Sequence, residues 1–161
     1  MELAKMREVC ARQEEVLRFE RFDQDVVWEL GQLMVEQMRR RGQNLCVAIW
    51  SLTGYTLFQY AAAGTTVNNQ NWMGRKFNAV RLMERSSLAS RAVAEMTGEG
   101  VPECGLDTRE YVFCGGGFPI RLKSGELVGV ALASGLPDVQ DHGFLIDCLQ
   151  KYLGVEAPTI E

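Results

Sequence analysis

The fold of this chain depends on the segment CGGGFPI at residues 114–120. Three adjacent glycines permit a left-handed backbone or the close approach of a ligand or another backbone, because no side chain stands in the way. The apolar pattern that follows predicts a hairpin with strands at 118–122 and 127–134. Pro119 cannot donate a ladder hydrogen bond, so its strand is predicted to lie at a sheet edge or a bulge.

Another hairpin is predicted upstream. Residues 45–50 form a continuous apolar run, Thr53-Gly54 favours a turn, and residues 55–60 return. Apolar residues spaced by three and four indicate amphipathic helices elsewhere. These helices are expected at 2–20, 25–41, 71–85, 88–96 and 137–153. Hairpins interleaved with helices, without strict βαβ alternation, predict a single α+β domain with an antiparallel sheet of four to five strands.

Composition narrows the class of protein. The chain has 161 residues, of which 47% are hydrophobic and 24% charged, as in ordinary globular domains. No apolar stretch approaches the ~20 residues of a membrane span, and the charged N-terminus argues against a secretory signal. The five cysteines are an odd number without a CxxC pair, which favours reduced thiols in the cytoplasm over disulfides or structural zinc.

Charge is distributed unevenly along the chain. Residues 26–98 carry eight Lys or Arg against four Asp or Glu, whereas residues 99–161 carry four against ten. Solvated faces of opposite sign explain this pattern, and so does a basic surface that holds an anionic ligand. The net charge of −4 and the lack of a recognised motif argue against nucleic-acid binding.

Four motifs occur in an order that resembles one branch of the GlcG/HbpS-like haem-degrading domain superfamily. They are WELG at 28–31, NWMGRKFN at 71–78, GGGFPI at 115–120, and SGLP at 134–137 with Asp141-His142. The resemblance covers roughly residues 20–154. It implies a profilin-like fold for a domain at 21–161, preceded by an N-terminal helix at 1–20. It also implies homo-oligomers, at least dimers, and haem or a corrinoid-related ligand for some members.

One position departs from the family pattern. Members of the superfamily usually carry histidine directly before the triple glycine, where this chain has Cys114. A thiol in place of an imidazole changes the softness of any ligand set there. His142 is the only histidine, so a histidine-rich metal site is excluded and no metal site is predicted.

The candidate ligand-binding residues combine cations, an aromatic wall and the glycine backbone. They are Trp72, Arg75, Lys76, Asn78, Cys114, Gly115, Gly116, Gly117 and His142. We expect Arg75 and Lys76 to neutralise an anionic planar or carboxylate-bearing molecule in one pocket with Cys114. The alternative is an interfacial helix whose cations pair with the acidic half of the chain. Cys114 as a buried small side chain and His142 as a helix-capping residue are the competing structural roles.

Three functional hypotheses remain open at this stage. The first is an oligomeric small-ligand-binding domain without robust catalysis. The second is a redox or haem-linked enzyme that uses Cys114 or His142, and the third is a structural or protein-partner scaffold. The sequence lacks a nucleophile–base pair at a recognisable spacing, so no catalytic residue is assigned.

Overall fold

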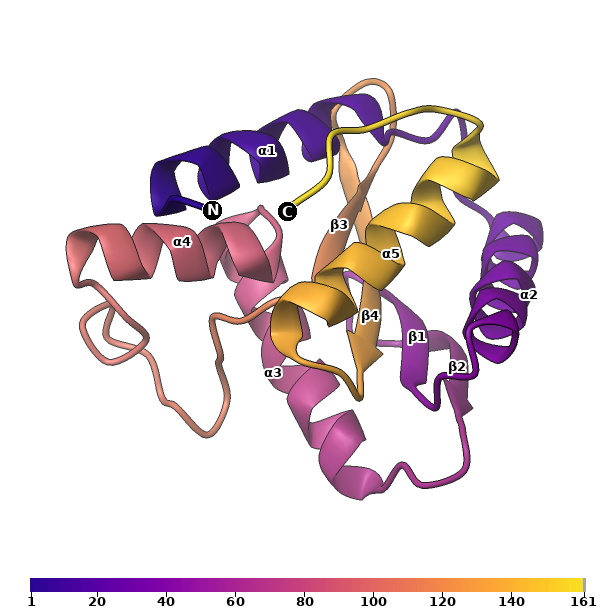
Figure 1. Ribbon diagram of the computed structural model, residues 1–161, viewed down its shortest axis with the longest axis horizontal. Coiled ribbons are helices and arrows are strands. Elements are labelled where there is room, and N and C mark those ends of the chain that lie inside the picture. Colours follow the sequence, from indigo (N-terminus) through magenta and orange to yellow (C-terminus); the bar gives the residue numbers. More distant parts are fainter. Residues whose placement is uncertain (161) are drawn as a thin grey trace.

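A four-stranded antiparallel sheet forms the centre of the protein in this computed structural model, which describes residues 1–160 (Figure 1). The strands are β1 (Cys46–Ser51), β2 (Thr56–Ala61), β3 (Gly117–Arg121) and β4 (Leu127–Ser134). Their order across the sheet is β2-β1-β4-β3, so β2 and β3 are the edges. The α+β fold with an antiparallel sheet is thereby confirmed, and Pro119 lies on an edge strand as predicted.

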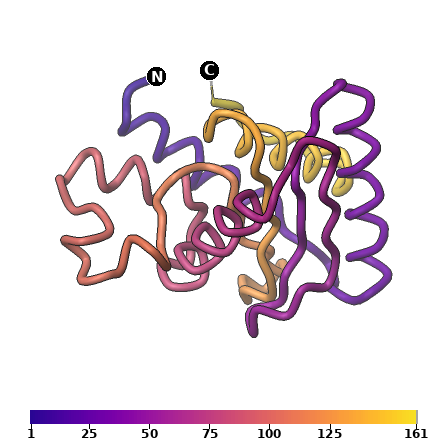
Figure 2. Tube along the Cα trace, turned by 90° about the horizontal axis from the view of Figure 1, so that it is seen from below, coloured from indigo at the N-terminus to yellow at the C-terminus, as the bar shows by residue number. Residues whose placement is uncertain are grey.

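Helices cover both faces of the sheet. They are α1 (Leu3–Val16), α2 (Gln24–Arg40), α3 (Val67–Met83), α4 (Ser87–Thr97) and α5 (Asp138–Leu153). Val47 and Ile49 of β1 join the core with α2 and α5, whereas Cys46 and Ala48 point to the α3 side. This alternation is the period of two expected for a strand buried on both faces. Figure 2 shows α2 and α3 on opposite sides of the strands.

Helix α1 packs on α4 of the same chain. Met6 and Cys10 are buried there against Leu88 and Ala92. The apolar stripe of the N-terminal segment is therefore covered without a second copy of the chain. The helix ends at Val16, earlier than the predicted residue 20, and the following segment runs along the edge of β3.

A short bridge closes that edge. The Phe19 N–H donates to the Arg121 carbonyl oxygen at 2.8 Å, and the Phe19 carbonyl oxygen accepts from the Lys123 N–H at 2.9 Å. Phe19 itself is 2% exposed, and its ring stacks with Tyr152 at 5.9 Å. The segment after α1 thus adds a parallel bridge beside β3.

Helix α3 starts at Val67, whereas the sequence predicted a start at residue 71. The predicted start was wrong because polar residues here cap the helix instead of interrupting it. The Thr66 Oγ1 accepts from the Asn68 N–H at 3.2 Å, and the Asn69 Oδ1 accepts from the Thr66 N–H at 2.9 Å. This reciprocal arrangement is a capping box.

The triple glycine lets three helices approach one strand closely. A Cβ on Gly115 would lie 2.2 Å from the Asp138 carbonyl oxygen, and one on Gly116 would lie 2.5 Å from the Lys76 Nζ. Gly116 also has a φ of +121°, a conformation that other residues rarely adopt. The glycines therefore accommodate backbone and side chains of this chain itself.

No helix within residues 1–160 is both long and apolar enough to cross a membrane.

Candidate ligand-binding site

Five of the nine predicted site residues lie in two neighbouring hollows along α3. We name the first the Cys114 cleft, and it has a volume of about 420 Å³. Its lining residues are Asn68, Asn69, Trp72, Lys76, Val112, Cys114, Ser134, Gly135, Leu136, Asp138 and Asp141. The second, which we name the arginine groove, has a volume of about 560 Å³. Its lining includes Trp50, Asn71, Arg75, Phe77, Asn78, Arg81, Arg109 and Glu110.

A buried ion pair forms the floor of the Cys114 cleft. The Lys76 Nζ lies 3.1 Å from the Asp141 Oδ2 and donates to the Ala133 carbonyl oxygen at 2.9 Å. Both side chains are 3% exposed. Burial raises the pKa of the Asp141 carboxyl, and the Lys76 ammonium and the Leu136 N–H oppose that rise. The Lys76 charge is thus already balanced within the chain, as the pairing alternative anticipated.

Two of the three backbone donors of the glycine segment are also engaged. The Gly115 N–H donates to the Asp138 Oδ2 at 3.0 Å, and the Gly117 N–H donates to the Ser87 Oγ at 2.9 Å. Asp138 in turn receives two hydrogen bonds from the Arg91 Nη1 at 2.9 Å. These donors therefore hold α4, α5 and the glycine segment together.

Cys114 supplies the thiol that lines the cleft. Burial raises the pKa of the Cys114 thiol, and the nearby Lys76 ammonium offsets only part of this effect. The thiol is therefore protonated at neutral pH, and a protonated thiol is a poor nucleophile and a poor metal ligand. Asp138 and Asp141 also line the cleft, so carboxylates outnumber the single Lys76 ammonium there.

Cations concentrate instead in the arginine groove. The Arg75 guanidinium lies 4.7 Å from the Trp72 ring centroid, and its Nε donates to the Thr108 carbonyl oxygen at 3.1 Å. The Arg81 guanidinium lies 5.1 Å from the Phe77 ring centroid. Arg109 extends from the loop that faces α3 and pairs with Asp107 at 2.8 Å. Glu110 is the single acid among the residues that line the groove.

The structure thus divides the predicted residues. Trp72, Lys76 and Cys114 share the Cys114 cleft, whereas Arg75 and Asn78 line the arginine groove. The stacked Trp72 and Arg75 side chains belong to different hollows although they touch. Sequence reasoning missed Arg81, which follows Asn78 by one helical turn and could have been found from the spacing of three. It also missed Arg109, because the sequence of a turn-rich loop does not show which part of the fold the loop packs against.

His142 faces neither of these hollows. Its ring is fully buried, and its Nε2 lies 2.8 Å from the Gln13 Oε1. The Gln13 Nε2 donates to the Pro158 carbonyl oxygen at 2.7 Å, so the Gln13 oxygen is the acceptor and the His142 Nε2 carries the proton. The His142 Nδ1 has no hydrogen-bond partner among residues 1–160. Burial lowers the pKa of His142 to about 4, so the imidazole is neutral at pH 7.

We expect His142 to make folding less favourable in acid. Its pKa in the folded chain is about 4, below the ordinary value of about 6.5, so its contribution is full above pH 6.5 and is lost as the pH falls to 4. The loss amounts to about 3 kcal/mol. Burial raises the pKa of Glu14 to about 7, which acts in the opposite sense, because the folded chain then binds the proton more tightly. His142→Gln should therefore become more stable relative to wild type between pH 7 and 4.

Chemical denaturation at several pH values measures this effect. Glu14→Gln is the matched variant, and it should show a steeper loss of stability in acid than the wild type. Parallel stability profiles for His142→Gln and wild type would show that the ring is not kept neutral by burial.

Comparison with known proteins places the chain in a family. The model of the family described as "Haem degrading protein HbpS-like" matches residues 22–150. The chain belongs to this family. A UPF0303 protein of Yersinia enterocolitica is 32% identical over 162 residues, which cover 100% of this chain and 96% of that protein. A UPF0303 protein of Yersinia pseudotuberculosis is also 32% identical, with 94% of its length covered.

Solved structures share the fold at lower identity. The Ybr137w protein superposes with a TM-score of 0.84 at 21% identity, covering 94% of each chain. HbpS superposes with a TM-score of 0.65 at 18% identity, covering 85% of this chain and 93% of HbpS. The PduOC:Heme complex gives a TM-score of 0.60 at 16% identity, covering 87% and 99%. The predicted membership in the HbpS-like superfamily and the predicted fold are confirmed.

Proposed function

We propose that this chain binds a planar, anionic small molecule in the arginine groove and catalyses no reaction on it. The observation that carries the proposal is the convergence of Arg75 and Arg81 on one hollow that also contains the Trp50 ring and Arg109, which pairs with Asp107. Guanidinium groups bind carboxylates through paired hydrogen bonds, and aromatic rings stack on flat ligands. A planar carboxylate is the ligand that uses both features.

The family suggests a first probe of this chemistry. Its description refers to haem degradation, and one solved relative is a haem complex. Haem is planar and carries carboxylates, which suits the arginine groove. A histidine-ligated haem does not fit this chain, however, because His142 is buried and bonded to Gln13. The residues of the groove support recognition of the ring and its acids, without ligation of iron by histidine.

Titration with haem and with the iron-free protoporphyrin tests this proposal. Both compounds should bind with similar affinity, since the groove recognises the flat ring and the carboxylates. Arg75→Ala and Arg81→Ala should each weaken binding of both compounds by about tenfold, because a hydrogen bond to a charged group contributes about 1.5–3 kcal/mol. Absorbance and fluorescence changes during the titration report the affinities.

Arg12→Ala is the matched control, because Arg12 is an exposed arginine of α1 that pairs with Glu15 away from the groove. It should leave both affinities unchanged. Binding that survives Arg75→Ala and Arg81→Ala would contradict the proposal. Binding of haem alone, abolished by Cys114→Ser, would favour the redox or haem-linked enzyme. Absence of binding by either compound would favour a protein-partner scaffold.

We also propose that the chain assembles into at least a dimer. The apolar stripe of α1 does not support this idea, because α4 of the same chain covers it. Support comes from large apolar side chains that remain on the surface, among them Tyr55 at 71% and Val67 at 81% exposure. Light scattering should give at least twice the 18.0 kDa of the chain. A constant mass of one chain at micromolar concentrations would refute assembly.

A cytoplasmic location remains our proposal and rests on the cysteines. All five are free thiols, and three of them are buried in the core. A reducing compartment keeps such thiols unpaired.

A further inference from the structure

The two edges of the sheet differ in how well they are protected. The β3 edge contains Pro119 and is covered by the bridge that Phe19 forms with Leu122. The β2 edge, with the sequence TLFQYA at residues 56–61, contains neither a charged residue nor a proline. Exposed edges are ordinarily blocked by such residues, since their unpaired backbone groups attract other strands. The β2 edge is left open to an additional strand.

The backbone of β2 presents its unpaired groups to this open edge. The Ala62 N–H donates to the carbonyl oxygen of Leu45 at 3.1 Å, in the register that pairs Ala61 with Cys46. Backbone groups of an antiparallel strand face its neighbour at every second residue. The N–H and C=O groups of Gln59 and Ala61 therefore point away from β1.

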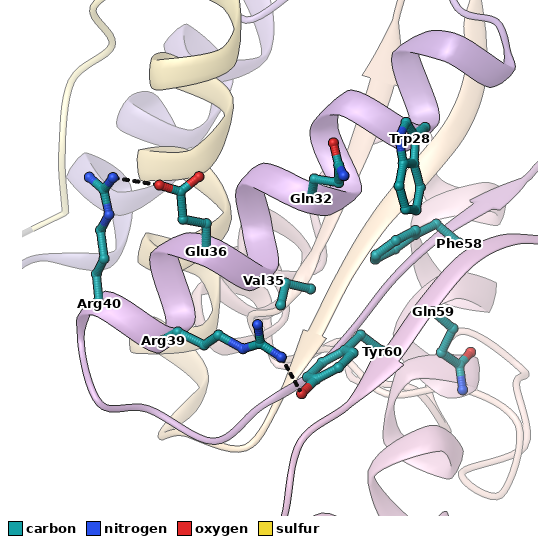
Figure 3. A pocket seen from close by; sticks show the side chains of 9 residues that line it. All are labelled: Trp28, Gln32, Val35, Glu36, Arg39, Arg40, Phe58, Gln59 and Tyr60. Atoms are coloured by element: carbon teal, nitrogen blue, oxygen red, sulfur yellow. Dashed lines mark hydrogen bonds and ion pairs between the residues drawn. The ribbon is translucent and has the colours of Figure 1, made fainter.

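A groove with a volume of about 590 Å³ runs between this edge and α2 (Figure 3). Trp28, Gln32, Val35 and Arg39 form one stripe of α2 along it, at spacings of three and four. Phe58 and Tyr60 of β2 lie opposite, as Figure 3 shows.

Two aromatic rings define the apolar end of the groove. The Phe58 ring packs on Gly31, where a Cβ would lie only 2.6 Å from the ring, so the helix and the strand are close together. Trp28 stands above it at a centroid distance of 6.4 Å and is 58% exposed. A tryptophan exposed to this degree beside a groove is typical of a binding surface.

A cation defines the other end. Arg40 pairs with Glu36, so the net positive charge of the groove comes from Arg39. The Arg39 Nη2 donates to the Tyr60 hydroxyl at 3.3 Å, and its guanidinium lies 5.6 Å from the Tyr60 ring centroid. Arg39 takes part in no ion pair with residues 1–160. The groove therefore combines an open strand edge, an apolar floor and a positive end.

We propose that this groove binds an extended segment of a partner protein that carries an acidic residue. The segment adds a strand to β2, places an apolar side chain between Trp28 and Tyr60, and sets a carboxylate against Arg39. Main-chain hydrogen bonds give affinity in this mode of binding, and alternate side chains give specificity. The site lies on the α2 side of the sheet, opposite the arginine groove on α3, and does not depend on the proposed small ligand.

A second copy of this chain is a poorer occupant. Its own β2 edge would bring an identical groove and a second Arg39, so two concave surfaces and two like charges would face each other. A single extended chain directs every second side chain to the same face and fills the groove.

A fluorescently labelled peptide of alternating threonine and valine or leucine, with one aspartate, serves as the probe. A twin peptide with asparagine in place of the aspartate measures the contribution of the charge. Fluorescence anisotropy should show that the wild type binds the acidic peptide with about fivefold higher affinity than its twin. This ratio corresponds to the contribution of an exposed ion pair, about 1 kcal/mol. In Arg39→Gln, this preference should disappear.

Two further variants test the strand and the aromatic end. Ala61→Pro removes an N–H that faces the open edge and is not bonded to β1, so binding should weaken more than tenfold while folding is retained. Ala61→Ser is the matched control and should bind as wild type does. Trp28→Ala should lower the affinity for both peptides about tenfold, because it removes the aromatic wall of the groove.

The outcomes distinguish a partner segment from a second copy of this chain. Peptide binding that is unaffected by Ala61→Pro and Trp28→Ala, or no binding of either peptide, would overturn the proposal. A particle mass that decreases in both Ala61→Pro and Trp28→Ala, measured by light scattering, would assign the groove to a second copy instead. Loss of peptide binding in these variants at unchanged mass supports the partner segment.

Discussion

Replacing Lys76 with methionine should lower the free energy of unfolding by about 3–5 kcal/mol, because it leaves a buried carboxylate without its partner. The Lys76 Nζ lies 3.1 Å from the Asp141 Oδ2, and both side chains are 3% exposed. The Ala133 carbonyl oxygen would lose its bond from Lys76 as well. Urea denaturation followed by circular dichroism measures the change.

Arg40→Met provides the matched control for this variant. Arg40 pairs with Glu36 on the exposed surface of α2, so the same change there should cost less than about 1 kcal/mol. The double variant Lys76→Met with Asp141→Asn should recover part of the lost stability, since it no longer buries a charge. Equal losses in Lys76→Met and Arg40→Met would show that the Lys76 pair is not a buried structural contact.

Local sequence signals were sufficient for most of the fold. The apolar runs at 45–50 and 127–133 are long and uninterrupted, and they lie in the two central strands β1 and β4. The ends of the helices were less predictable, because polar residues occur both in loops and at helix caps. Thr66 and Asn69 precede the predicted helix start at residue 71, although their side chains form the cap of α3.

The site could be predicted only in part, because its parts come together through tertiary contacts. Lys76 and Arg75 are adjacent in sequence, yet a helix turns them in different directions. The Lys76 side chain enters the core toward Asp141, which is 65 residues away in the sequence, whereas the Arg75 side chain stacks on Trp72 at the surface. Nothing in the local sequence shows that Asp141 neutralises Lys76, or that the loop near Thr108 returns to Arg75.

The triple glycine illustrates the same limit. Its sequence permitted a positive φ or the close approach of a ligand or another backbone. The structure identifies the neighbours as Asp138, Lys76 and Ser87 of three helices. A glycine leaves room for a neighbouring group, but the local sequence does not show which group packs there.

Gly115→Ala should accordingly destabilise the protein by about 3 kcal/mol or more. The new methyl group would lie 2.2 Å from the Asp138 carbonyl oxygen and 3.1 Å from the His142 Cβ. The first neighbour is backbone at the start of α5, so relief requires a shift of the helix. Asp138 resists that shift, because its carboxylate holds both Arg91 and the Gly115 N–H. For a chain of this length, the melting temperature should fall by about 6–12 °C.

Gly143→Ala is the matched substitution within α5. A Cβ at Gly143 meets nothing within 4 Å, so alanine should stabilise the helix by up to about 1 kcal/mol through its higher helix propensity. Opposite shifts of the melting temperature in the two variants, measured by calorimetry, are the expected result. A melting temperature within 2 °C of wild type for Gly115→Ala would mean that α5 does not pack on the glycine segment as closely as described, because a methyl group would then have found space there.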